Sequence, residues 1–90
     1  MKQTDVLKEF KIENGQLWRR KKRASGEYWA LIQSKFVVFN GKNTSVSRIC
    51  YCVLKGDVDN DSYVYQVDKD ASVCDLDNLM LIKKRKKGEV

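Results

Sequence analysis

One amphipathic segment in the middle of the chain constrains the fold most. Apolar residues fall at positions 46, 49, 50, 53 and 54, which is the spacing of one face of an α-helix. Thr44 or Ser45 can cap the start of this helix, and Gly56 stands just past its end, where helices commonly stop. The pattern predicts a helix over residues 46–54 that packs its apolar stripe against neighbouring strands.

The residues before this helix favour strands. Aromatic and β-branched side chains dominate residues 27–33 and 35–39. Asn40-Gly41 supplies the two positive-φ positions of a type I′ turn, so residues 42–44 begin a return strand. We expect an antiparallel meander of two or three strands, with the helix packed on it.

The N-terminal part predicts three short features. Residues 6–10 form a small apolar helical face, with Thr4 or Asp5 as N-cap. Asn14-Gly15 predicts a turn, and residues 16–19 a brief strand with Leu17 or Trp18 in the core. The charged run that follows, up to Gly26, predicts an exposed loop.

The last third of the chain predicts a hairpin around a polar loop. Tyr63, Tyr65 and Val67 alternate on one face of a first strand, and the apolar run 79–82 forms the second. The whole chain is therefore expected to be a single α+β domain over residues 1–90. Its two parts are a helix, meander and central helix in residues 1–56, and a hairpin with a basic tail in residues 57–90.

Composition excludes several classes of protein. The chain of 90 residues has room for one core, and no apolar run approaches the length of a membrane span or a signal sequence. We expect a cytoplasmic protein with no membrane partner. The three cysteines are too few for a zinc site without any histidine, so we expect reduced thiols packed in the core and no cofactor.

The net charge of +6 is spread unevenly. Residues 57–77 carry seven aspartates against one lysine, a balance of −6, which leaves +12 for the rest. Two five-residue basic runs, at 19–23 and 83–87, account for much of that excess. Such polarity fits a protein that binds charged partners, although a basic run is equally typical of a solvated loop.

With its elements in this order, the chain resembles the small HNH endonucleases of bacteriophages and mobile introns. The resemblance is carried by Gly15-Gln16-Leu17-Trp18, Asn40-Gly41-Lys42, Ser47-Arg48-Ile49 with Gly56, and positions 64–79. It implies that the last part of the chain is an HNH-like ββα hairpin. The family's next helix would begin at Lys83, so this hairpin is expected to be truncated.

The same resemblance implies that the active site is degenerate. Tyr65 stands where the family has a metal-binding Asp, Gln66 where it has the general-base His, and Cys74 where an Asn braces the loop. Phosphodiester hydrolysis needs a bound divalent cation and a general base. Tyrosine is a poor metal ligand, and glutamine cannot act as the base. We therefore expect no enzyme activity. Asp68 and Asp70, with Asp75 or Asp77, are a possible oxygen cluster for Mg²⁺ or Ca²⁺, but capping of turns is the stronger interpretation.

Two functions follow for a non-catalytic phage accessory protein. The first is stoichiometric binding of DNA or a host nucleoprotein; the candidate residues are Trp18, Arg19, Arg20, Lys21, Lys22, Arg23, Lys83, Lys84, Arg85, Lys86 and Lys87. The second is inhibition of a host defence or nucleic-acid-processing enzyme, in the manner of an anti-CRISPR protein. The basic groove of that host enzyme would bind an acidic face of this protein, made by Asp57, Asp59, Asp61, Asp68, Asp70, Asp75 and Asp77. Either partner places the protein in the cytoplasm of a bacterial host.

Overall fold

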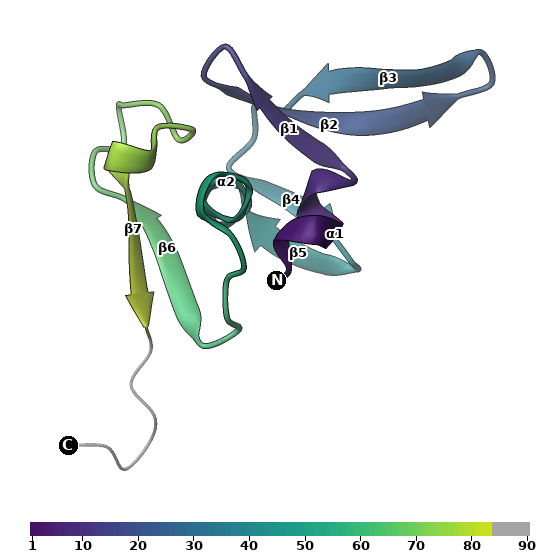
Figure 1. Ribbon diagram of the computed structural model, residues 1–90. Coiled ribbons are helices and arrows are strands. Elements are labelled where there is room, and N and C mark those ends of the chain that lie inside the picture. The colour runs from purple at the N-terminus through teal and green to yellow at the C-terminus, as the bar shows by residue number, and fades with distance from the viewer. Residues whose placement is uncertain (84–90) are drawn as a thin grey trace.

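Three small antiparallel sheets surround one central helix in the computed structural model, which describes residues 1–83 (Figure 1). The sheets have the strand orders β1-β2-β3, β4-β5 and β6-β7 and share no strand. The elements are α1 (Gln3–Leu7), β1 (Phe10–Glu13), β2 (Gln16–Arg23), β3 (Gly26–Leu31), β4 (Phe36–Phe39), β5 (Lys42–Ser45), α2 (Val46–Lys55), β6 (Ser62–Gln66), the 3-10 turn η1 (Leu76–Asn78) and β7 (Leu79–Lys83). Neither α-helix in this part of the chain has the length and apolar character that a membrane crossing requires. The protein is thus a small α+β fold of hairpins with one packed helix.

The central helix, α2, confirms the prediction from the apolar stripe. The Ser45 hydroxyl accepts a hydrogen bond from the backbone N–H of Arg48 at 3.3 Å and caps the first turn. Gly56 follows the last turn with φ 124°, and its N–H donates to the Cys52 carbonyl at 3.0 Å. One detail differs: Leu54 is exposed, while Cys52 is fully buried. The reason is that α1 and the N-terminus cover a second side of the helix.

The core lies between α2, α1 and the first two sheets. Phe10 and Phe39 meet edge to face, with ring centroids 5.6 Å apart at 67°. Leu17, Ile49 and Val6 are buried beside them, which confirms Leu17 as the core residue of its strand. The N-terminal residue is held in place as well. The Met1 amino group donates to the Val58 carbonyl at 2.7 Å, and the Val58 N–H donates back at 2.8 Å.

Both Asn-Gly turns are confirmed. Asn14 and Gly15 have φ 54° and 71°, and Asn40 and Gly41 have φ 51° and 75°. Two consecutive positive values are the geometry of a type I′ turn, whose twist matches that of the strands it joins. These turns set the register of β1 with β2 and of β4 with β5.

The N-terminal half also shows four errors in the sequence interpretation. Helix α1 begins after Lys2 without any side-chain cap, so the prediction of Thr4 or Asp5 as N-cap is wrong, and Phe10 belongs to a strand. The charged run is not a loop, because β2 continues through it to Arg23. Strand β3 pairs with β2 and not with β4, because the tight turn at residues 24–25 returns the chain along β2.

The predicted hairpin of the last third is present as β6 and β7. Tyr63 pairs with Ile82 and Tyr65 with Met80, and these four side chains are exposed on one face. The opposite face carries Val64, which is buried against the rest of the molecule. The alternation of Tyr63 and Tyr65 is therefore as expected, and their face points to solvent; the placement of Val67 on the same strand is wrong, because β6 ends at Gln66.

Arg48 ties α2 to the start of this hairpin. Its Nη1 donates to the Ser62 carbonyl and its Nη2 to the Asp59 carbonyl, both at 2.6 Å. A planar guanidinium is suited to two such bonds at once, since its donors form a rigid fork. The side chain therefore orders the connector between the helix and β6.

Replacing Arg48 should destabilise the fold. We expect Arg48→Met to lower the free energy of unfolding by about 2 kcal/mol, because two charge-assisted hydrogen bonds to backbone carbonyls are lost. Urea denaturation followed by circular dichroism measures this. Lys55→Met is the matched control on the same helix and should change stability by less than about 0.5 kcal/mol. Equal effects of the two substitutions would contradict the role given to Arg48.

Candidate nucleic-acid interface

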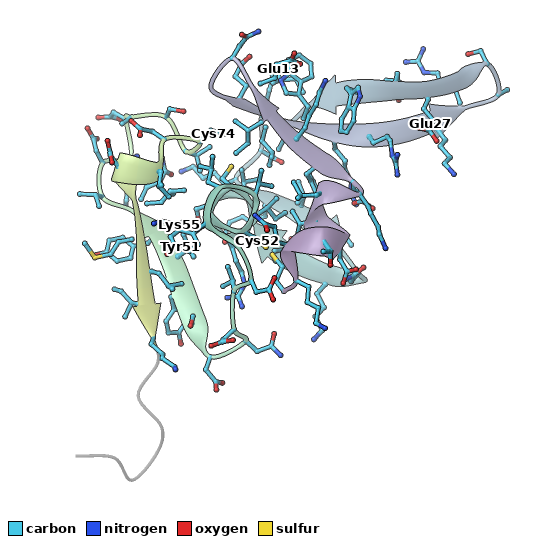
Figure 2. All side chains as sticks on the ribbon, viewed as in Figure 1. Glu13, Glu27, Tyr51, Cys52, Lys55 and Cys74 are labelled. Atoms are coloured by element: carbon cyan, nitrogen blue, oxygen red, sulfur yellow. The ribbon has the colours of Figure 1, made fainter. Side chains whose placement is uncertain are left out.

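The β2–β3 hairpin extends beyond the rest of the molecule as a two-stranded ribbon (Figure 1). Strand β1 pairs with β2 only from Gln16 to Arg19, and the Arg20 N–H donates to the Glu9 carbonyl at 2.7 Å, so residues 21–23 pair with β3 alone. Arg20, Lys21, Lys22 and Arg23 are all exposed. Glu27, labelled on the ribbon in Figure 2, is the single acidic residue between positions 16 and 31. The distal half of the ribbon is therefore strongly cationic.

Alternation along the strands distributes these cations over both faces of the ribbon. Arg20 and Lys22 share a face with Trp29, because Arg20 is directly opposite Trp29 in the register. Lys21 and Arg23 share the other face, on which Lys21 is opposite Tyr28. Each face thus combines two cations with an aromatic ring.

The aromatic rings on the ribbon are in contact with cations. The Arg23 guanidinium lies 4.0 Å from the centre of the Tyr28 ring, and the Lys11 ammonium lies 4.6 Å from that of Trp29. The Trp18 indole N–H donates to the Glu13 carbonyl at 3.3 Å, so its polar edge is used within the fold. Trp29 is 37% exposed and Trp18 is less so, which makes Trp29 the more accessible ring for stacking.

Arg19 differs from the other cations of the run. It pairs with the Glu9 carboxylate at 2.5 Å and lies 5.1 Å from the centre of the Phe10 ring. Arg20 is 3.7 Å from Glu27, a longer contact between two exposed groups. Arg19 is therefore part of the fold, whereas the cations at 20–23 are available to a partner. The second basic run is described only at Lys83, which is exposed at the end of β7; Lys84, Arg85, Lys86 and Lys87 lie outside the described residues.

The seven aspartates do not gather on one face. Asp57, Asp59 and Asp61 precede β6, and Asp68, Asp70, Asp75 and Asp77 follow it, so the two groups lie at opposite ends of one hairpin. Within residues 1–83, no three cysteine, aspartate or glutamate side chains are close enough to hold a metal ion.

Three of these carboxylates act within the fold. Asp57 accepts from the Gln3 N–H at 2.8 Å, Asp68 from the Asp70 N–H at 3.0 Å, and Asp75 from the Asp77 N–H at 3.0 Å. The last two bonds cap turns, which confirms the interpretation preferred from the sequence.

The three degenerate positions point to different places. The Tyr65 hydroxyl contacts the Met80 sulfur at 3.3 Å on the exposed face, and the Gln66 amide donates to the Ala71 carbonyl at 3.1 Å. Cys74 is buried beside Cys50 of α2. Tyr65 and Gln66 line one pocket beside the start of α2, and Cys74 is not among the residues that line it.

Asn78 organises the loop between β6 and β7, a role that the sequence analysis did not assign. Its carbonyl oxygen accepts from the Asp68 N–H at 2.8 Å, and its amide nitrogen donates to the Asp68 carbonyl at 2.9 Å and to that of Ser72 at 3.2 Å. The side chain is almost fully buried. The signal in the sequence was weak, because an asparagine before a strand equally suits an ordinary turn.

Comparisons with protein-family models, with curated proteins and with solved structures find no match for this chain. The resemblance to HNH endonucleases therefore rests on the pattern of residues alone.

Within the basic run 19–23, Arg19 should stabilise the fold, whereas the cations that follow it should contribute little to stability. We expect Arg19→Ala to lower the free energy of unfolding by about 1 to 2 kcal/mol, because it loses an ion pair and a ring contact. Lys21→Ala, one strand position further, should change it by less than about 0.5 kcal/mol. Thermal denaturation of the two variants beside the wild type measures the difference, and the reverse order would refute the assignment.

Proposed function

We propose that the protein is a non-catalytic accessory protein of HNH-nuclease ancestry that binds DNA stoichiometrically through the β2–β3 ribbon, in the cytoplasm of a bacterial host of a phage. One observation carries the proposal: four consecutive exposed cations on a two-stranded ribbon that projects from the core. The competing interpretation is that these residues form a solvated loop. Such a loop would not need the ordered pair of strands on which the cations lie.

The shape of the ribbon suits a nucleic-acid groove. The major groove of B-DNA admits a two-stranded β-ribbon. Cations on both faces then reach phosphates on both sides of the groove, Arg20 and Lys22 on one side, Lys21 and Arg23 on the other. Neutralising phosphates releases bound counterions, so affinity should depend steeply on salt and little on sequence.

The absence of catalysis is part of the proposal. It is supported by Tyr65 and Gln66, which supply neither a carboxylate ligand nor an imidazole base at the positions where the resemblance places them. Metal-dependent nicking of plasmid DNA that Asp68→Ala abolishes would overturn this part.

A second candidate function is inhibition of a host enzyme that handles nucleic acid. Its support is the exposure of the aspartates at both ends of the β6–β7 hairpin. Among the described residues, none of their carboxylates is within ion-pair distance of a cation. Such groups complement the basic groove of a nucleic-acid-binding enzyme. A pull-down from host extract that is lost on charge reversal of Asp59 and Asp61 would favour this function over DNA binding.

Neutralising the ribbon tests the first function. We expect Lys21→Gln/Lys22→Gln/Arg23→Gln to weaken binding of labelled duplex DNA at least about tenfold at low salt, because three phosphate contacts are lost. The slope of log affinity against log salt should become shallower by about 0.9 for each lost contact. Fluorescence anisotropy at several salt concentrations measures both quantities.

The matched control removes the same charge from other elements. Lys35→Gln/Lys42→Gln/Lys55→Gln substitutes three exposed lysines outside the ribbon and should change affinity by less than about twofold. Equal losses in the two triple variants would show that net charge, not the ribbon, drives binding. No measurable binding of the wild type at low salt would refute the proposal altogether.

A further inference from the structure

Two buried thiols from distant parts of the chain face each other. The sulfurs of Cys50, in α2, and Cys74, in the loop before η1, are 3.3 Å apart. A disulfide bond requires a separation of roughly 2.0 Å, so the two sulfurs need to approach by only roughly 1 Å. Both cysteines are free thiols in this structure.

The surroundings make the two thiols unequal. The hydrogen bond shared with Cys74 and burial raise the pKa of Cys50, and either sulfur of the pair could be the donor in that bond. Cys74 also retains 8% exposure, while Cys50 has none. Because of this difference in exposure, Cys74 is the thiol that a reagent from solvent reaches first, and its thiolate form is the nucleophile.

The third cysteine is placed apart from this pair. Cys52 lies two positions along the helix, with its sulfur 3.9 Å from the Met1 carbonyl. Figure 2 shows it on the side of α2 that faces α1, whereas Cys74 lies on the other side of the helix. Burial raises the pKa of Cys52, so this residue stays a protonated thiol, which is less reactive than a thiolate.

We propose that Cys50 and Cys74 form a reversible intramolecular disulfide when a low-molecular-weight disulfide oxidises them. The Cys74 thiolate attacks one sulfur of the small disulfide, which forms a mixed disulfide and releases one small thiolate. Cys50 then loses its proton and attacks the Cys74 sulfur, which expels the second small thiolate. Two protein thiols are oxidised, one small disulfide is reduced, and the two protons end on the two released thiols.

The bond would fasten the loop of residues 67–78 to α2. In the reduced protein this loop is held by the hydrogen bonds of Asn78 and Gln66, by the burial of Cys74, and by a contact to the β1–β2 turn, in which the Ser72 hydroxyl donates to the Gly15 carbonyl at 3.1 Å. A covalent link across residues 50–74 removes conformational freedom from the unfolded chain. Oxidation therefore stabilises the attachment of the hairpin to the rest of the fold.

Controlled oxidation of the purified full chain tests the proposal. The protein is incubated with mixtures of oxidised and reduced glutathione, alkylated with iodoacetamide and analysed by intact mass and peptide mapping. We expect a mass loss of two hydrogen atoms, a single Cys50–Cys74 linked peptide and alkylation of Cys52 after unfolding. The Tm should rise by about 10 to 20 °C and return on addition of dithiothreitol.

Single cysteine variants supply the controls. Cys52→Ala should still form the bond, Cys74→Ala should form none, and Cys50→Ala should accumulate glutathione on Cys74. A bond that involves Cys52, or no intramolecular bond in the wild type under oxidising conditions, would overturn the proposal. The peptide map of the wild type decides this even where a variant fails to fold.

Discussion

Burial of helix α2 on more than one side is the interaction on which the rest of the structure depends. Sheets of two or three strands are marginally stable by themselves, and the three sheets here share no strand. Helix α2 packs against α1, β1, β5 and β6 and so brings them into one core. Ile49, Cys50 and Cys52 are completely buried in it. Full burial of a large apolar side chain such as Ile49 contributes about 1.5 to 3 kcal/mol. Without the helix, the hairpins would have no common partner.

The features that the sequence predicted are those whose signals are local. The apolar stripe of α2, its Ser45 cap and the two Asn-Gly turns each lie within a few residues, and all are confirmed. Strand β2 was missed beyond Arg19 because successive charged residues hide any alternation. Hydrogen bonds to β3 hold that part of the strand, and little of it is buried. The predicted partner of β3 was also wrong, because the turn at residues 24–25 carries no Asn-Gly signal and was hidden in the charged run.

For the candidate site, the sequence identified residues better than their arrangement. The basic run was recognised, but not that it lies on a ribbon or that Arg19 is bound to Glu9. The aspartates looked like one acidic face, yet a short hairpin places neighbours in sequence at its two ends. The bracing by Asn78 and the meeting of Cys50 with Cys74 depend on tertiary packing, for which a single sequence carries no periodic signal.

The hairpin topology has a consequence for how the chain folds. In the described residues, every strand pairs only with a strand next to it in the sequence, across two-residue turns in the first two sheets and across the loop 67–78 between β6 and β7. Pairings of this kind close short loops, and proteins rich in them have low contact order and fold fast for their size. We therefore expect the docking of the hairpins on α2, and not a search for distant strand partners, to limit the rate of folding.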